Sequence, residues 1–130
     1  MNEAEKGEIT LKFSAAMAAR DIDLLNAIMT NDVIWSLPGS SLMSGEEQGV
    51  EAILKRAEIM HRHEVNVEIE YVVFGLNDVA QHLHNTAQYG GRVLDEHISN
   101  VYKLRDNKIC RIDTFVSDVD MLNGFFVLGN

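Results

Sequence analysis

The sequence has little of what extracellular, nucleic-acid-binding and membrane proteins require. Cys110 is the sole cysteine in 130 residues, so the chain cannot form an internal disulfide, and this fits a reducing compartment. Lys and Arg number 11 against 20 Asp and Glu, and the formal charge of −9 argues against nucleic acid or an anionic membrane as a partner. We therefore expect a cytoplasmic protein.

Long apolar runs are missing as well, and the chain contains a single proline. No run approaches the roughly 20 residues that a membrane span needs, and the charged first residues are unlike a signal peptide. The sequence shows no repeat, low-complexity tract or linker. Apolar residues make up 46% and charged residues 24% of the chain, which is typical of a globular protein with one hydrophobic core. The sequence predicts one domain over residues 1–130.

Apolar residues recur at helical spacing in the first half of the chain and alternate with polar residues in the second half. Helices are predicted at residues 3–20, 22–29 and 48–61, with a short strand at 33–37. Strands are predicted at residues 64–74, 79–89, 92–105 and 108–116, followed by a helical turn near 119–126. This order predicts an α+β fold in which three N-terminal helices pack on the concave face of a curved, mainly antiparallel sheet, forming a cone.

The predicted sheet is organised around a hairpin with the turn Gly90-Gly91, because both glycines can take positive φ. A two-residue turn pairs Tyr89 with Arg92 and fixes which residues share a face of the sheet. One face then carries Leu83, Asn85, Ala87, Leu94, Glu96, Ile98 and Asn100. The opposite face carries His82, His84 and His97. The first set mixes apolar and polar side chains in the way that a pocket lining does.

Three stretches of the chain carry a resemblance to a known family. They are residues 33–39 (VIWSLPG) with Ser44-Gly45, residues 91–95 (GRVLD) and residues 101–109 (VYKLRDNKI). Over nearly its whole length the chain resembles the SnoaL-like branch of the nuclear transport factor 2-like superfamily. The resemblance implies a pocket between the helices and the concave sheet face. It implies no single reaction, because the superfamily includes ketosteroid isomerases, limonene epoxide hydrolases, polyketide cyclases and proteins without catalytic activity.

The catalytic residues of these relatives are not kept in this sequence. The ketosteroid isomerase positions fall on Ser36, Phe13 and Asn100, of which Asn100 alone can still act as an oxyanion donor, through its amide. The acid/base pair of the polyketide cyclases falls on Asn100 and Thr114. The water-orienting pair of the epoxide hydrolases falls on Ile34 and Ser36. The resemblance therefore leaves the reaction open.

The pocket is expected to draw on the hairpin, the first helix and the first strand. Its predicted ligand-binding residues are Phe13, Met17, Ile34, Leu83, Asn85, Glu96, Ile98 and Tyr102. The predicted catalytic residues are Asp113 as general base and Asn100 and Ser36 as its hydrogen-bond partners. Glu96 and the histidines are the other groups that could transfer a proton.

The direction of Asp113 depends on the turn at Asp106-Asn107. A two-residue loop pairs Arg105 with Lys108 and places Asp113 beside Asn100 in the pocket. A three-residue loop pairs Leu104 with Lys108 instead and turns Asp113 outward. The sequence leaves both alternatives open.

Two functions are therefore compatible with the sequence. The chain either binds a small, largely apolar, carbonyl-bearing or polycyclic ligand without catalysis, or it is a polyketide cyclase/isomerase-type enzyme that uses Asp113 as general base. The enzyme needs a carboxylate or histidine inside the pocket, whereas an interior with only Ser36, Asn85 and Asn100 would favour the binding protein. No cofactor is expected.

The three histidines of the opposite sheet face could bind zinc, since imidazole is a zinc ligand. A flat strand face rarely brings side chains close enough together, and Asp95 is the one carboxylate evident beside them in sequence, so no metal site is predicted. Neutral imidazoles among valines are instead typical of a subunit interface. We expect a homodimer that forms through this outer sheet face.

Overall fold

The computed structural model describes residues 1–127 of the chain. Its helices are α1 (Glu3–Ala19), α2 (Ile22–Ile28), α3 (Val50–Arg62) and α4 (Val119–Phe125). Its strands are β1 (Met29–Leu37), β2 (Gly45–Gln48), β3 (Asn66–Phe74), β4 (Asp78–Tyr89), β5 (Arg92–Arg105) and β6 (Lys108–Val116). None of the helices in this part of the chain is long and apolar enough to cross a membrane.

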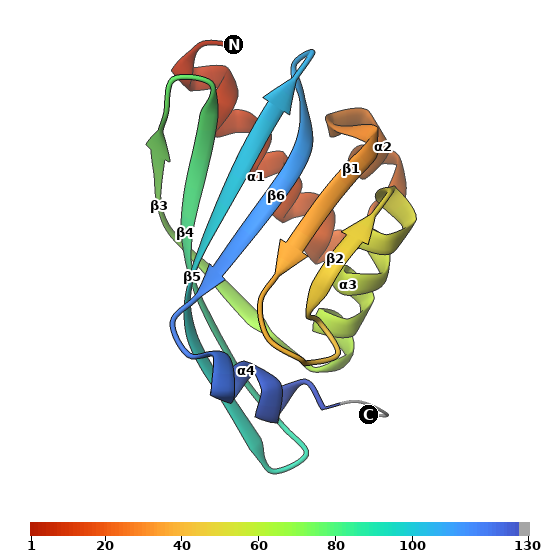
Figure 1. Cartoon of the computed structure of the whole chain (residues 1–130), viewed down its shortest axis with the longest axis vertical. Coiled ribbons are helices and arrows are strands. Elements are labelled where there is room, and N and C mark those ends of the chain that lie inside the picture. Colours follow the sequence, from red (N-terminus) through yellow and green to blue (C-terminus); the bar gives the residue numbers. More distant parts are fainter. Residues whose placement is uncertain (128–130) are drawn as a thin grey trace.

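The strands form one six-stranded sheet in the order β2-β1-β6-β5-β4-β3. Neighbouring strands are antiparallel except for β1 and β6, which are parallel. Figure 1 shows α1, α2 and α3 together on one face of the sheet and α4 at one end of it. The predicted α+β cone is confirmed, with a mixed rather than purely antiparallel sheet.

The N-terminal helices begin and end at residues suited to those positions. Asn2 and Glu5 form a capping box at the start of α1, each side chain accepting from the other residue's backbone N–H. Asp21 caps α2 by accepting from the backbone N–H of Leu24. The stripe of α1 that contains Ile9 and Phe13 is buried against the sheet, which is the apolar face that the spacing predicts.

The central hairpin has the predicted register. Gly90 and Gly91 both have positive φ, at 59° and 78°, and Tyr89 pairs with Arg92. Asn85 consequently lies opposite Glu96 on the face that the helices cover. The imidazole-bearing face points away from the helices, as the alternation of β4 and β5 predicts.

The strand β6 departs from both alternatives considered for Asp113. The turn has two residues, since Arg105 pairs with Lys108, yet a bulge near Cys110 shifts the register along the rest of the strand. As a result Thr114, and not Asp113, lies opposite Asn100 on the inner face. The prediction that a two-residue loop turns Asp113 inward was wrong because it assumed an unbroken ladder.

The two edge strands of the sheet also differ from the sequence prediction. The strand β2 was missed because its four residues, GEEQ, are all exposed and show no apolar alternation. The strand β3 was predicted to be half-buried, but it is an edge strand that is exposed along nearly all of its length. A register shift between Ile69 and Tyr71 turns Tyr71 onto the outer face, where it pairs with His82.

Candidate functional site

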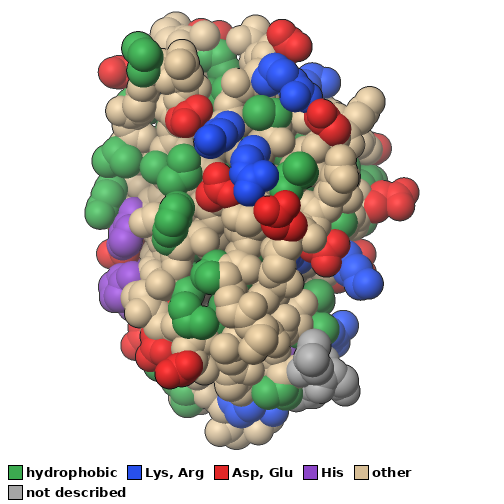
Figure 2. Space-filling view, viewed as in Figure 1, with side chains coloured by type: hydrophobic (Ala, Val, Ile, Leu, Met, Phe, Trp, Pro, Cys, Tyr) green, Lys and Arg blue, Asp and Glu red, His purple; other side chains and the backbone are tan. Residues whose placement is uncertain are grey.

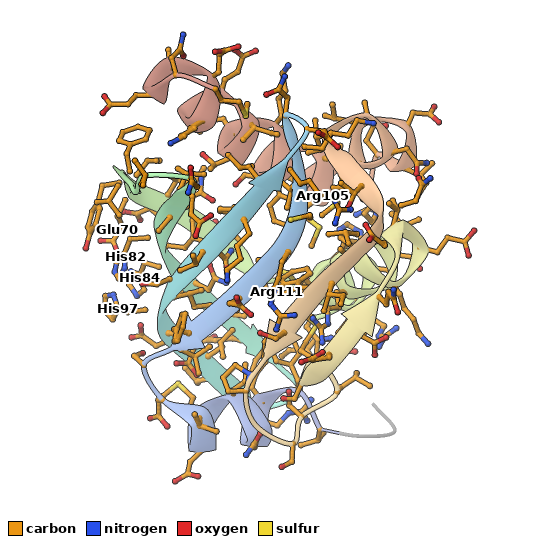
Figure 3. All side chains as sticks on the ribbon, turned by 45° about the horizontal axis from the view of Figure 1, so that its top comes forward. Glu70, His82, His84, His97, Arg105 and Arg111 are labelled. Carbon is orange, nitrogen blue, oxygen red and sulfur yellow. The ribbon has the colours of Figure 1, made fainter. Side chains whose placement is uncertain are left out.

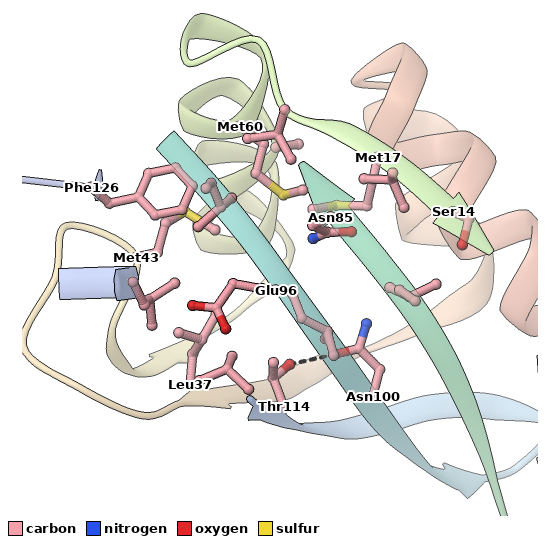
Figure 4. Close-up of a pocket in the computed structure, with 18 of the residues that line it drawn as sticks. Ser14, Met17, Leu37, Met43, Met60, Asn85, Glu96, Asn100, Thr114 and Phe126 are labelled. Atoms are coloured by element: carbon pink, nitrogen blue, oxygen red, sulfur yellow. Dashed lines mark hydrogen bonds between the residues drawn. The ribbon is translucent and has the colours of Figure 1, made fainter. Parts of the chain in front are cut away.

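A cavity of about 370 Å³ lies between the helices and the inner face of the sheet. Its walls are mainly apolar, with Phe13 and Met17 from α1, Met60 from α3, and Leu83 and Ile98 from the central hairpin. Figure 4 shows these walls around a small number of polar side chains. Such a cavity suits a small ligand that is apolar over most of its surface.

Buried hydrogen bonds connect the floor of the pocket. The indole Nε1–H of Trp35 donates to the hydroxyl of Thr114 at 2.7 Å, and this hydroxyl donates to Oδ1 of Asn100 at 2.6 Å. The amide Nδ2 of Asn100 then donates to the hydroxyl of Tyr102, which donates to Oε1 of Gln81 at 2.9 Å. The four bonds thus run in one direction, from the indole N–H, which can only donate, to the amide oxygen of Gln81. In this arrangement the NH₂ group of Asn100 points to Tyr102.

Glu96 is the carboxyl group inside this pocket, and its side chain is fully buried. Its Oε1 accepts from the backbone N–H of Asp118 at 2.8 Å and from the hydroxyl of Ser117 at 3.1 Å. Its Oε2 makes no hydrogen bond within residues 1–127, and the same holds for Oδ1 of Asn85 directly across the hairpin. Unpaired buried oxygens of this kind are costly unless something donates to them.

Burial also shifts the pKa of this carboxyl group. Loss of water contact raises the pKa of Glu96, and the nearby negative charges of Asp118 and Asp95 act in the same direction. The hydrogen bonds from Asp118 N–H and Ser117 lower it, but by less. Burial thus disfavours the charged carboxylate, and the neutral acid has a hydroxyl that can donate to a ligand oxygen.

A family model for the SnoaL-like domain matches residues 11–112, which is most of the chain. The chain belongs to the SnoaL-like domain family. No curated protein sequence gives a significant match. The family resemblance of residues 33–39, 91–95 and 101–109 is confirmed by this match.

Solved structures share the fold of this SnoaL-like chain at low sequence identity. Bal32a, from a soil-derived mobile gene cassette, is 20% identical with a TM-score of 0.86, and the match covers 95% of this chain and 97% of that one. An NTF2-like protein from Burkholderia xenovorans LB400 is 21% identical with a TM-score of 0.84, over 97% of this chain and 98% of that one. A candidate SnoaL-like polyketide cyclase from Jannaschia sp. CCS1 is 15% identical with a TM-score of 0.72, over 88% and 87%. At these identities the likeness shows the fold alone.

Most of the side chains predicted to line the pocket of the SnoaL-like domain do lie there. They are Phe13, Met17, Leu83, Asn85, Glu96, Ile98 and Asn100. Tyr102 lies behind this lining, where it is completely buried and hydrogen-bonded to Asn100 and Gln81. Their roles toward a ligand remain predictions.

Three predicted site residues face away from the pocket. In β1 the buried positions are Val33, Trp35 and Leu37, so Ile34 and Ser36 lie on the outer face. Asp113 lies there too, accepting from the hydroxyl of Ser36 at 2.7 Å and from Nε of Arg111 at 3.0 Å. The placement of Ile34 and Ser36 in the pocket was wrong because the inward face of β1 had been assigned to the wrong set of alternating residues. The placement of Asp113 there was wrong because of the bulge in β6.

Other pocket residues of this SnoaL-like domain were missed. Trp35 lines the cavity in place of Ile34, and Thr114 takes the position expected for Asp113. Met43 and Phe126 add walls from a loop and from the end of α4. The alternation of β1 could have identified Trp35, since its indole is the bulkiest apolar group there. Nothing local marks Met43 or Phe126, because long-range packing brings them to the cavity.

Proposed function

We propose that this protein binds a small, largely apolar molecule with a carbonyl group, and that Glu96 holds the carbonyl oxygen in the pocket. The observation that carries the proposal is the unpaired Oε2 of Glu96, with the unpaired Oδ1 of Asn85 on the paired strand, in a mainly apolar cavity. A neutral carboxyl at this position donates through Oε2–H, and the amide across the hairpin offers an acceptor for a ligand hydroxyl. The apolar walls exclude water, which strengthens both contacts.

Trp35 provides a direct measure of occupancy, because it is the single tryptophan of the chain and lines the cavity. The matched probes 2-tetralone and tetralin have the same fused rings and differ in the carbonyl group. We expect 2-tetralone to change the Trp35 fluorescence saturably and to bind more tightly than tetralin. Equal affinity for both probes would contradict a carbonyl contact, and no saturable change with either would contradict the pocket.

Variants separate the proposed contact from general packing. Glu96→Met replaces the carboxyl group with an apolar side chain of similar size, and it should weaken binding of 2-tetralone by about tenfold, which is roughly 1.4 kcal/mol, while tetralin binds as before. Asp113→Asn lies on the outer face and serves as the control, since it should leave both affinities unchanged. Circular dichroism would verify that each variant is folded.

The same probe tests the alternative function, an enzyme that transfers a proton. Asp113 cannot serve as the base in the pocket, and Glu96 is the carboxyl group that lies there. In its ionised form Oε2 would take a proton from the carbon next to the ketone, leaving the electron pair in an enolate, and would then return a proton to that carbon. In D₂O this reaction exchanges hydrogen for deuterium in 2-tetralone. Exchange above the buffer rate that disappears in Glu96→Gln would favour the enzyme, and exchange at the buffer rate would favour binding alone.

We further propose that two copies associate through the outer sheet face. Large apolar side chains are exposed there, among them Tyr71 and Val73 on β3, Val93 on β5 and Phe115 on β6. Figure 2 shows this face, with apolar and histidine side chains gathered toward one margin. Exposed aromatic groups among polar neighbours support an interface of two like surfaces. Sedimentation should give a dimer that Phe115→Ser dissociates, and a monomeric wild type would contradict the proposal.

A further inference from the structure

Three potential metal ligands meet on the outer face of the sheet, on the side opposite the pocket. Glu70 lies on β3, His82 on β4 and His97 on β5, and their ligand atoms are all within 4.8 Å of one another. Oε1 of Glu70 lies 3.4 Å from Nε2 of His82 and 3.7 Å from Nδ1 of His97. Figure 3 shows the three side chains grouped at this edge of the sheet, with His84 beside them. Two imidazoles from different strands thus share one carboxylate oxygen.

The irregularity of β3 brings the carboxylate to the histidines. The pairing passes from Ile69–Leu83 to Tyr71–His82, so Glu70 is the extra residue of a bulge opposite a single residue of β4. A bulge changes the direction in which a side chain points, and here the side chain of Glu70 lies beside His82 and His97. The sequence pattern did not reveal this carboxylate, since regular alternation gives no sign of a bulge.

Neighbouring groups hold the two imidazoles in orientations suited to a metal ion. Nδ1 of His82 lies 3.2 Å from the hydroxyl of Ser99, and a hydrogen bond donated from Nδ1–H leaves the lone pair of Nε2 toward Glu70. The ring of His82 stacks on Tyr71 at 4.9 Å between ring centroids, and the ring of His97 stacks on His84 at 4.6 Å. These contacts limit ring rotation before any ion binds.

We propose that Glu70, His82 and His97 form a binding site for a divalent transition-metal ion of the Zn²⁺ class. Two imidazole nitrogens and one carboxylate oxygen are a donor set that such ions accept, with water completing the coordination. In a tetrahedral zinc site, ligand atoms lie about 3.3 Å apart, which is close to the two distances measured from Oε1 of Glu70. In the single chain the side chains of Glu70, His82 and His97 are 33%, 24% and 56% exposed, so an ion can enter before two copies associate, and small rotations can complete the geometry.

The site is distinct from the pocket on which the proposed function rests. Glu96 and Asn85 project from β5 and β4 toward the helices, whereas His97 and His82 project from the same strands away from them. Failure of ligand binding in the pocket would therefore leave the metal proposal intact, and the reverse also holds.

Isothermal titration of the metal-free full chain with ZnCl₂ at about pH 7.5, where imidazoles are mostly neutral, tests the proposal. We expect one Zn²⁺ per chain, and Co²⁺ in its place should give the visible absorption bands of a four- or five-coordinate ion. His82→Gln, His97→Gln and Glu70→Gln should each weaken binding by tenfold or more. His61→Gln, which changes a histidine on α3, is the matched control and should not alter the affinity.

Ser99→Ala distinguishes a built site from three residues that merely lie near one another. Loss of the hydroxyl that orients His82 should weaken Zn²⁺ about tenfold without removing a ligand. Absence of saturable binding, an affinity unchanged in His82→Gln, or half an ion per chain in a dimer would each overturn the proposal of a complete site in one chain. The variants lie at the surface, and a circular dichroism spectrum like that of the wild type would show that they are folded.

Discussion

The two faces of one sheet place the same residue types in opposite environments. On the inner face the carboxyl of Glu96 is fully buried, and desolvation raises its pKa. On the outer face the carboxylate of Asp113 pairs with Arg111, and that hydrogen bond raises the pKa of the arginine. Burial thus disfavours a charged carboxylate on the inner face, whereas the outer face holds an ion pair. The two faces of one sheet can therefore hold acidic residues in different electrostatic surroundings.

Substitution of one phenylalanine on each side of the sheet tests how strongly burial separates the two environments. Phe13 is 3% exposed and packs edge-on against Trp35 and Tyr102, whereas Phe115 is 60% exposed on β6. Phe13→Ala should lower the free energy of unfolding by about 3–5 kcal/mol through lost burial and a new cavity. Phe115→Ala should change that of the isolated chain by less than about 0.5 kcal/mol. Urea unfolding measures both, and similar losses in the two variants would break the comparison.

The neighbouring residues Asn100 and Ser99 make the same test with polar side chains. Asn100→Leu leaves the hydroxyl of Thr114 without its acceptor inside the protein, and the expected loss is about 1–3 kcal/mol. Ser99→Ala at the half-buried neighbouring position on the outer face should cost less than about 0.5 kcal/mol in metal-free buffer. A stable Asn100→Leu variant would show that the buried hydrogen-bond chain is not needed for the fold.

The inner carboxyl should also give a characteristic pH dependence. A carboxyl whose pKa is raised by folding contributes stability at low pH that is lost as the pH rises through the folded-state value. Glu96→Gln cannot ionise and keeps an oxygen that accepts from the backbone N–H of Asp118. Relative to the wild type, this variant should therefore gain stability as the pH rises above about 4.5, the ordinary pKa of a glutamate, measured by urea unfolding with EDTA present. A difference that does not change with pH would refute the raised pKa.

The smallest expected effect is that of an outer-face substitution on ligand binding in the pocket. Ser36→Ala removes the hydroxyl that donates to Asp113, but neither residue reaches the cavity. The affinity for 2-tetralone, measured by Trp35 fluorescence, should be the same as in the wild type. A loss of tenfold would place the ligand on the outer face and reverse the assignment of the two faces.

Local signals explain what the sequence could predict. The Gly90-Gly91 turn set the hairpin register because both glycines adopt positive φ, and this register brought Glu96 opposite Asn85. Alternation alone could not show which side of β1 faces the helices, so Ser36 was predicted inside where Trp35 lies. The bulges at Glu70 and near Cys110 depend on how neighbouring strands fit one another, and no residue in the chain marks them in advance.

The parallel pairing of β1 with β6 has a consequence for how the protein is made. The hydrogen bond from Trp35 to Thr114 joins positions 79 apart in the chain, and it closes one wall of the pocket. During synthesis, the edge of β1 that pairs with β6 stays unpaired until β6 has left the ribosome, although the β4–β5 hairpin can form earlier. Closing so long a loop is slow, so the docking of the last strand should limit the folding rate. The pocket would then form at the last step of folding, when β6 pairs with β1.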